Sequence, residues 1–192
     1  MTKIRNLKKT LLSDNWYTLN KFNFDVQDKN GEWNPVEREA YDRGNGATIL
    51  LYNKQNKTVV LTKQFRLPTY VNGNKDGMLV EACAGLLDKD NPEDCIKKET
   101  EEETGYRIKK VEKVFEVYMS PGSVTEILYF FTGEYSDDMK VSEGGGVETE
   151  NENITVLELD FEVAYAMMGT GEIMDAKTIM LLQHAKLNVL LK

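Results

Sequence analysis

The sequence has few of the residues that disulfide frameworks and transition-metal sites require. Its 192 residues include one histidine and two cysteines. Cys83 and Cys95 cannot form a disulfide framework and lack the spacing and partners of a zinc site, so we expect two small buried thiols. His184 falls in the last predicted helix, where we expect a structural or exposed role. A catalytic base is therefore expected among the carboxylates.

Long hydrophobic runs are also missing. The basic segment 1–9 lacks the apolar stretch of a signal peptide, and no later segment approaches membrane-spanning length. We therefore expect a cytoplasmic protein with no membrane partner. The formal net charge of -8 disfavours nucleic acid as a partner, because the molecule repels polyanions. An anionic substrate would need a metal ion or locally placed Arg and Lys side chains.

Hydrophobic residues make up 41% of the chain, which is enough for one sizeable core. We therefore expect one compact domain with a terminal extension. Alternating aromatic-rich runs at 16–26 and 32–41, joined by a turn at 28–31 that contains Asn-Gly, predict an N-terminal hairpin. We divide the chain into a β-rich extension, residues 1–43, and a main domain, residues 44–192.

The main domain is predicted to be α+β. Asn91 suits a helix N-cap, Pro92 the first helical position and Gly105 a C-terminal stop, which predicts a short helix between them. An acidic, glycine-rich loop at 143–152 is expected to be mobile, with three glycines that let it swing over a substrate. Strands are predicted at 47–52, 58–65, 78–84, 111–119, 126–135 and 154–159, and further helices at 161–168 and 176–191.

Three carboxylates stand together in the predicted helix between Pro92 and Gly105. Glu99, Glu102 and Glu103 are spaced i, i+3 and i+4, so one helix face carries all three. They repel one another at the end of the helix where the dipole disfavours negative charge. A solvated acidic face is the usual interpretation of such a cluster. A hard divalent cation such as Mg²⁺ would offset the repulsion.

The sequence around this helix resembles the Nudix box. That family's pattern is Gly, five residues, Glu, seven residues, and then Arg-Glu-aliphatic-x-Glu-Glu-x-Gly-aliphatic. Its second half corresponds to 98–106, where Lys98 replaces the Arg and Thr100 the aliphatic residue. The stretch from Gly85 to Glu99 is one residue short, and Asp90 or Asn91 takes the place of the first Glu. The resemblance implies the Nudix fold, an α/β/α sandwich around a mixed sheet, here with an N-terminal antiparallel β extension.

The resemblance also implies a Mg²⁺ site, carried over residue by residue. Its ligands would be Glu99, Glu103 and the backbone carbonyl of Ala84, and Glu102 would be a secondary or water-mediated catalytic contact. Glu150, on the acidic loop, is the first candidate for a further ligand or the base. The loop is longer than in the family, which leaves its alignment open. Glu148 and Glu152 are therefore the next candidates after Glu150.

The whole chain resembles the bacterial Nudix hydrolases that act on GDP-mannose, in segments such as 41–53, 71–74, 118–122 and 144–148. The implied reaction is Mg²⁺-dependent hydrolysis of a nucleoside-diphosphate sugar, giving GMP and mannose 1-phosphate from GDP-mannose. The implied assembly is a homodimer whose N-terminal strands reach the partner's active site. The implied substrate contacts are Trp16, Glu37, Arg38, Glu39, Arg66, Gly85, Leu86, Glu126, Thr149, Glu150 and Lys177, and Arg66 would also stabilise charge on the phosphate in catalysis.

Three other functions stay open. An ADP-ribose pyrophosphatase would share the metal site and differ in its base and distal-sugar contacts. A non-catalytic nucleotide-binding Nudix module is disfavoured by the intact Glu99, Glu102 and Glu103. A non-enzymatic acidic domain would show no Mg²⁺-dependent thermal shift with a nucleotide sugar present.

Overall fold

The structure is a computed structural model that describes residues 3–87, 89–147 and 152–190. The chain divides into two compact units. The N-terminal unit comprises Met1–Asn45 and Tyr118–Ile127, and the main unit comprises Gly46–Val117 and Leu128–Lys192. The expected boundary after residue 43 lies close to the end of the first segment, but the segment 118–127 was not expected to join the extension.

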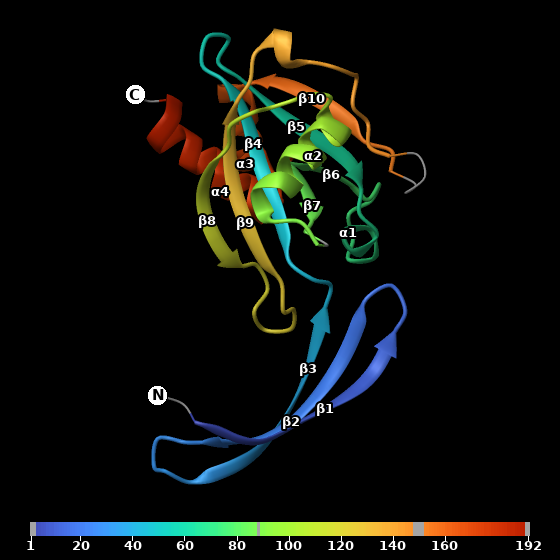
Figure 1. Cartoon of the computed structure of the whole chain (residues 1–192), viewed down its shortest axis with the longest axis vertical. Helices are drawn as coiled ribbons and strands as arrows, with labels where there is room; N and C mark the ends of the chain where they lie inside the picture. The colour runs from blue at the N-terminus through green and yellow to red at the C-terminus, as the bar shows by residue number, and fades with distance from the viewer. Residues whose placement is uncertain (1–2, 88, 148–151, 191–192) are drawn as a thin grey trace. The chain divides into compact units, whose positions relative to one another are not determined.

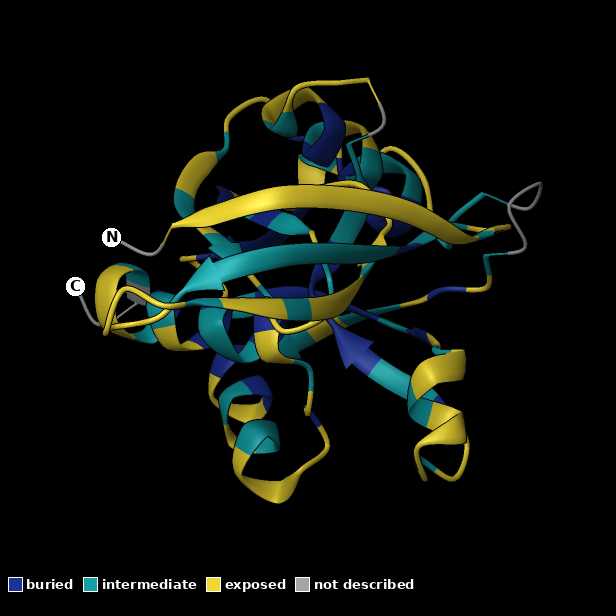
Figure 2. Ribbon diagram, turned by 90° about the horizontal axis from the view of Figure 1, so that it is seen from below, coloured by how far each residue is buried: buried dark blue, intermediate teal, exposed yellow. Residues whose placement is uncertain are grey.

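The N-terminal unit is a three-stranded antiparallel sheet in the order β1 (Ile4–Asp14), β2 (Thr18–Gln27) and β3 (Trp33–Asp42). The predicted turn is confirmed, because Asp28 Oδ1 accepts the N–H of Asn30 at 2.8 Å and Gly31 has a φ of +86°. The prediction of only two strands was wrong. Most of β1 is exposed (Figure 2), so no buried face produces the alternation by which a strand is recognised.

The main unit contains a mixed sheet with the order β10-β5-β4-β9-β8, in which β6 pairs with β5 and β7 with β4. Strands β4 and β9 are parallel, whereas β4 and β5 are antiparallel. Helix α2 packs on one face and α3 and α4 on the other (Figure 1), which confirms the α+β sandwich. The strands are β4 (Gly46–Asn53), β5 (Thr58–Phe65), β6 (Met78–Glu81), β7 (Cys83–Leu86), β8 (Glu112–Tyr118), β9 (Ile127–Glu134) and β10 (Thr155–Asp160). The helices are α1 (Leu67–Val71), α2 (Pro92–Thr104), α3 (Phe161–Thr170) and α4 (Ala176–Ala185), with a 3-10 turn at Asp137–Met139.

The strand predicted at 78–84 is in fact two strands that separate at Ala82. The first pairs with β5 and the second with β4. Side-chain hydroxyls bind the backbone at this break: the N–H of Ala82 donates to Thr178 Oγ1 at 2.7 Å, and Thr48 Oγ1 donates to the carbonyl of Cys83 at 3.0 Å. Because buried backbone groups need partners, these threonines allow the chain to change strand partner inside the molecule.

Both predicted ends of α2 are confirmed. Asn91 Oδ1 accepts the N–H groups of Glu93 and Asp94 at 3.1 and 3.0 Å, and Pro92 takes the first helical position. Gly105 adopts the left-handed conformation at the C-terminus, with a φ of +78°. Local capping rules therefore fix the length of the helix that carries the acidic face.

The other helices differ from the predictions in detail. Helix α3 continues past residue 168 to Thr170, and α4 ends at Ala185, after which 186–190 form a π-helical turn. Helix α1 was not predicted, because five residues are too few for a recognisable period. None of the helices within the described residues is long and apolar enough to span a membrane.

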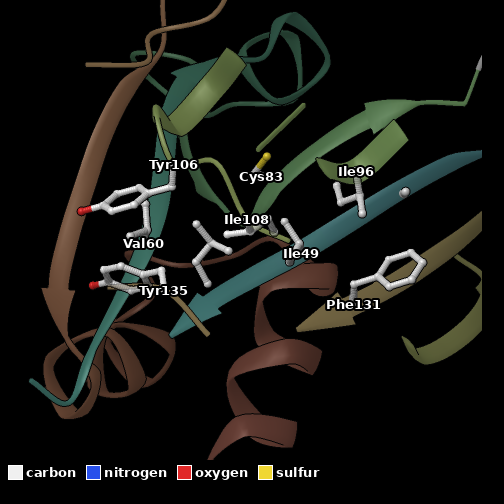
Figure 3. Packing of buried hydrophobic residues seen from close by; sticks show 10 residues of the cluster. Ile49, Val60, Cys83, Ile96, Tyr106, Ile108, Phe131 and Tyr135 are labelled. Atoms are coloured by element: carbon white, nitrogen blue, oxygen red, sulfur yellow. The ribbon is translucent and has the colours of Figure 1, made fainter. Parts of the chain in front are cut away.

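A hydrophobic cluster between α2 and the sheet holds the acidic helix in place. Ile96 of α2 is fully buried, and Ile49 and Phe131 of β4 and β9 belong to the same cluster (Figure 3). Cys83 is a member, and both cysteines are buried free thiols, as expected. This apolar contact fixes α2 against β7, so the acidic face of the helix has a defined position.

Replacing Thr178 by Val is expected to lower the free energy of unfolding by about 1–3 kcal/mol. The variant leaves the buried N–H of Ala82 without its acceptor and removes the bond from Thr178 Oγ1 to Asp175 Oδ2, at 2.6 Å. Urea denaturation followed by circular dichroism measures the loss. The control Thr178→Ser keeps the hydroxyl and should lose less; equal losses would contradict the role of the hydroxyl.

Candidate active site

Glu99 lies directly against the end of strand β7. A Cβ atom built on Gly85 would come within 2.1 Å of Glu99 Cδ, so the carboxyl group fills the space that any other residue's side chain would need. The structure therefore brings Glu99 to the segment that contains Ala84 and Leu86, and their roles as metal ligands and substrate contact stay predictions. Gly85 is required here because any side chain at this position would collide with the carboxyl group of Glu99.

Glu103 is the most buried of the three carboxylates. It is 2% exposed, and its Oε2 has no hydrogen-bond partner within the described part of the chain. Burial is the main cause that raises the pKa of Glu103 from 4.5 to about 8. The charges of Glu99 and Glu152 raise that pKa further, while a hydrogen bond from the Cys83 thiol and the charge of Arg66 lower it. A buried carboxylate with an unpaired oxygen is a strong candidate for cation binding.

Glu102 lies on the more open side of α2. Its side chain is 33% exposed, and Lys98 Nζ lies 3.4 Å from its Oε2. This one-turn ion pair offsets part of the repulsion on the acidic face. The secondary role of Glu102 in metal binding or catalysis stays a prediction.

The glycines of the acidic loop cap the end of α2. The N–H of Gly145 donates to the Glu103 carbonyl at 2.9 Å, and that of Gly146 to the Glu102 carbonyl at 3.2 Å. Gly144 has a φ of +69°, and a Cβ there would lie 2.5 Å from the Glu103 carbonyl oxygen. The sequence analysis explained these glycines by flexibility, but in the structure the positive φ angles of 144–146 serve to bind the helix end. Movement of the loop over a substrate stays a prediction.

Glu152 is the one carboxylate from the second half of this loop that lies within the described residues. Its Oε2 accepts the N–H of Val147 at 3.1 Å, and its charge raises the pKa of Glu103. Glu148, Thr149 and Glu150 lie outside the described residues, so their roles as base, ligand or substrate contact stay predictions.

Arg66 and Lys177, both predicted to bind phosphate or sugar, meet at a carboxylate that the sequence analysis missed. Arg66 Nε donates to Glu81 Oε2 at 2.6 Å, and Lys177 Nζ donates to Glu81 Oε1 at 2.5 Å. Asp175 Oδ2 lies 3.1 Å from the same ammonium. A lone acidic residue in an otherwise apolar strand at 78–84 was the available signal, because a buried carboxylate needs a cationic partner.

The other predicted substrate contacts belong to the N-terminal unit. Trp16 is 83% exposed, and Glu37, Arg38 and Glu39 are exposed residues of β3. Glu126 forms an ion pair within the same unit, at 3.6 Å. Their binding roles stay predictions.

The residues around α2 fit a divalent cation. Glu103 has an unpaired buried oxygen, and Gly85 makes room for the carboxyl group of Glu99. Among the described residues no three His, Cys, Asp or Glu side chains converge into a complete cage. Two carboxylates, the carbonyl of Ala84, water and substrate oxygens would together form the usual oxygen coordination of a hard cation.

This fold, with a carboxylate pair on a helix that follows a glycine-containing strand, is that of the Nudix hydrolases. The NUDIX domain model matches residues 42–166, and the chain belongs to that family. Nudix hydrolases generally use a divalent cation. Residues 3–41 match the model described as the GDP-mannose pyrophosphatase NudK N-terminal domain.

Relatives that are similar along nearly the whole chain are named GDP-mannose pyrophosphatase. The protein from Yersinia enterocolitica is 59% identical over 190 residues, which cover 99% of this chain and 98% of the relative. The protein from Pectobacterium atrosepticum is 60% identical over 179 residues, 93% of this chain and 92% of the relative. These similarities confirm the family predicted from the Nudix box.

Glu103→Gln is expected to remove a pH dependence from the stability of the metal-free protein. The pKa of Glu103 is about 8 in the folded protein, above its usual 4.5. Protonated Glu103 therefore adds to the free energy of unfolding fully below pH 4.5, and this addition is lost as the pH rises toward 8. One group changes the free energy of unfolding by at most about 1.4 kcal/mol per pH unit. Denaturant unfolding of both proteins with chelator, between about pH 5 and 8, measures the difference; a pH-independent difference would contradict the burial of this carboxyl.

Proposed function

We propose that this protein hydrolyses the diphosphate of GDP-mannose with Mg²⁺, giving GMP and mannose 1-phosphate. Support for hydrolysis comes from the unpaired buried oxygen of Glu103 beside Glu99, in a Nudix domain. Support for the substrate comes from the match at residues 3–41 to the N-terminal domain of a GDP-mannose pyrophosphatase, and from relatives of that name.

The proposed metal ligands are Glu99, Glu103 and the carbonyl of Ala84. Mg²⁺ held there would supply the positive charge that neutralises the diphosphate and would make a bound water more acidic. The terminal nitrogens of Arg66 hold a phosphate oxygen and stabilise its charge through paired donors. Glu150 accepts the proton of the attacking water, and Glu102 assists through water.

The N-terminal unit supports the proposed homodimer. Ile4, Leu7 and Leu11 on β1 are 55%, 56% and 55% exposed, so this sheet offers apolar side chains that a partner could bury. A second copy would cover them and bring the extension to the active site of its partner, as one symmetric interface allows. Trp16 would then stack on the base, with Glu37, Arg38 and Glu39 at the nucleotide or sugar. A cytoplasmic location completes the proposal.

Purified protein is expected to turn over GDP-mannose with a kcat/KM at least about tenfold above that for ADP-ribose, a difference of about 1.4 kcal/mol in transition-state binding. Side-by-side assays with Mg²⁺, with products separated by chromatography, measure both values. Preference for ADP-ribose would replace the proposed substrate and keep the family chemistry. Absence of turnover with either substrate, together with a Mg²⁺-dependent thermal shift, would favour a binding module.

The loop carboxylates are expected to separate into two roles. Glu150→Gln should lower kcat by about 10²-fold with a smaller change in KM, because the proposed base is lost. Glu152→Gln should instead change the Mg²⁺ concentration at half-maximal activity, because the charge of Glu152 acts on Glu103. Glu148→Gln is the matched control and should change both least. Titrations of kcat against Mg²⁺ for the three variants decide; a larger kcat loss in Glu152→Gln would transfer the role of base to Glu152.

A further inference from the structure

We propose that Glu81 is a positioning residue of the active site, which orients the guanidinium of Arg66 and links it to Lys177. This inference rests on the proposed function and deepens it, because it assigns a role to a residue outside the Nudix box. Glu81 would not touch the substrate. It would fix the orientation of the Arg66 guanidinium and the Lys177 ammonium, the proposed phosphate-binding cations.

The geometry around Glu81 is that of a bridge. Its side chain is only 4% exposed, and its two carboxylate oxygens accept from different cations. Oε2 accepts from Arg66 Nε at 2.6 Å, and Oε1 accepts from Lys177 Nζ at 2.5 Å. A carboxylate with one cation on each oxygen cannot rotate without breaking a charge-assisted hydrogen bond. Glu81 therefore fixes the two cations relative to each other.

The hydrogen bond at Nε leaves the outer edge of Arg66 available. A guanidinium is a rigid planar fork, so a partner at Nε sets the plane and the direction of both terminal nitrogens. The described residues provide no hydrogen-bond partner for these two nitrogens, and the side chain is 38% exposed. Within the described residues, these two terminal nitrogens are therefore available to a phosphate oxygen.

The other end of the bridge is anchored in helix α4. Lys177 is 9% exposed, and its ammonium also pairs with Asp175, the N-cap of α4. An ammonium has three donors, so donors remain for a substrate contact beside the hydrogen bond to Glu81 and the ion pair with Asp175. In the next position Thr178 accepts the N–H of Ala82, the neighbour of Glu81. The first turn of α4 thus binds the side chain of Glu81 and the backbone N–H of the residue that follows it.

A purely structural role would not need the bond to Arg66. Lys177 and Asp175 already form a pair on α4, and a lone buried carboxylate between strands adds a desolvation cost. What Glu81 adds is a rigid connection from this buried pair to the half-exposed Arg66. Residues that bind a reacting group work best when their orientation is fixed before the substrate arrives.

A double-mutant cycle tests the coupling. Glu81→Gln is expected to lower kcat by about tenfold or more, with Arg66→Lys lowering it at least as much. The combined variant should be no slower than Arg66→Lys by more than about threefold, because a positioning residue has no effect once its target is removed. Losses that multiply in the double variant would overturn the proposal. Glu81→Asp, which keeps the charge and shortens the side chain, gives the same cycle if Glu81→Gln does not fold.

A measurement that does not depend on activity completes the test. In ¹H–¹⁵N spectra the Nε–H signal of Arg66, assigned with Arg66→Lys, should exchange slowly with solvent in the wild type and rapidly in Glu81→Gln or Glu81→Asp. The matched control is Glu158→Gln, which alters a carboxylate bound by the Tyr135 hydroxyl at 2.7 Å in the same sheet. The control should leave both kcat and the Arg66 signal unchanged.

The outcomes separate the two proposals. If the wild type hydrolyses no nucleotide sugar, the proposed function fails, and the exchange rate of the Arg66 Nε–H alone decides whether Glu81 orients Arg66. If the wild type is active and Glu81→Gln does not change the solvent exchange of the Arg66 Nε–H, the positioning role fails and the proposed function stands. An equal effect of Glu158→Gln on the signal would also overturn it, because the change would then reflect general loosening of the sheet.

Discussion

The burial of Glu103 at the C-terminal end of α2 is the constraint on which the rest of the site depends. A carboxylate there meets low polarity, a second carboxylate and the negative end of a helix dipole at once. The surrounding chain reduces this cost only in part, through the Cys83 thiol and through glycine N–H groups on the last carbonyls of the helix. A divalent cation would offset the remainder, which is the physical basis of the proposed Mg²⁺ site.

The same segment of the sheet serves both halves of the site. The break at Ala82 turns Glu81 toward Arg66 and Lys177, and three residues later Gly85 admits the carboxyl group of Glu99. One short stretch therefore connects the proposed phosphate-binding cations with the proposed metal ligands. Its position depends on helix α4, which lies far away in the sequence, so the C-terminal helix contributes to the site as well as to the core.

Local rules were sufficient to predict α2 and its acidic face, because caps and carboxylates all lie within one short segment. They failed where a partner comes from elsewhere. Glu81 and Lys177 are separated by 96 residues, so no window of sequence shows that they pair. The glycines at 144–146 were interpreted as flexible for the same reason, since the helix end that they bind is distant in the chain. Strand β1 has no buried face to reveal it.

One further contact of the acidic loop bears on how this protein family can vary. The N–H of Ile154 donates to the carbonyl of Gly145 at 3.1 Å, and these two residues form the base of the loop. Residues inserted beyond this closed base need not disturb the cap on α2. Loop closure entropy grows slowly, by about 0.6 kcal/mol for each doubling of length. The loop can therefore accept insertions and deletions between related enzymes at little thermodynamic cost, and its length is free to evolve while the metal-binding helix stays fixed.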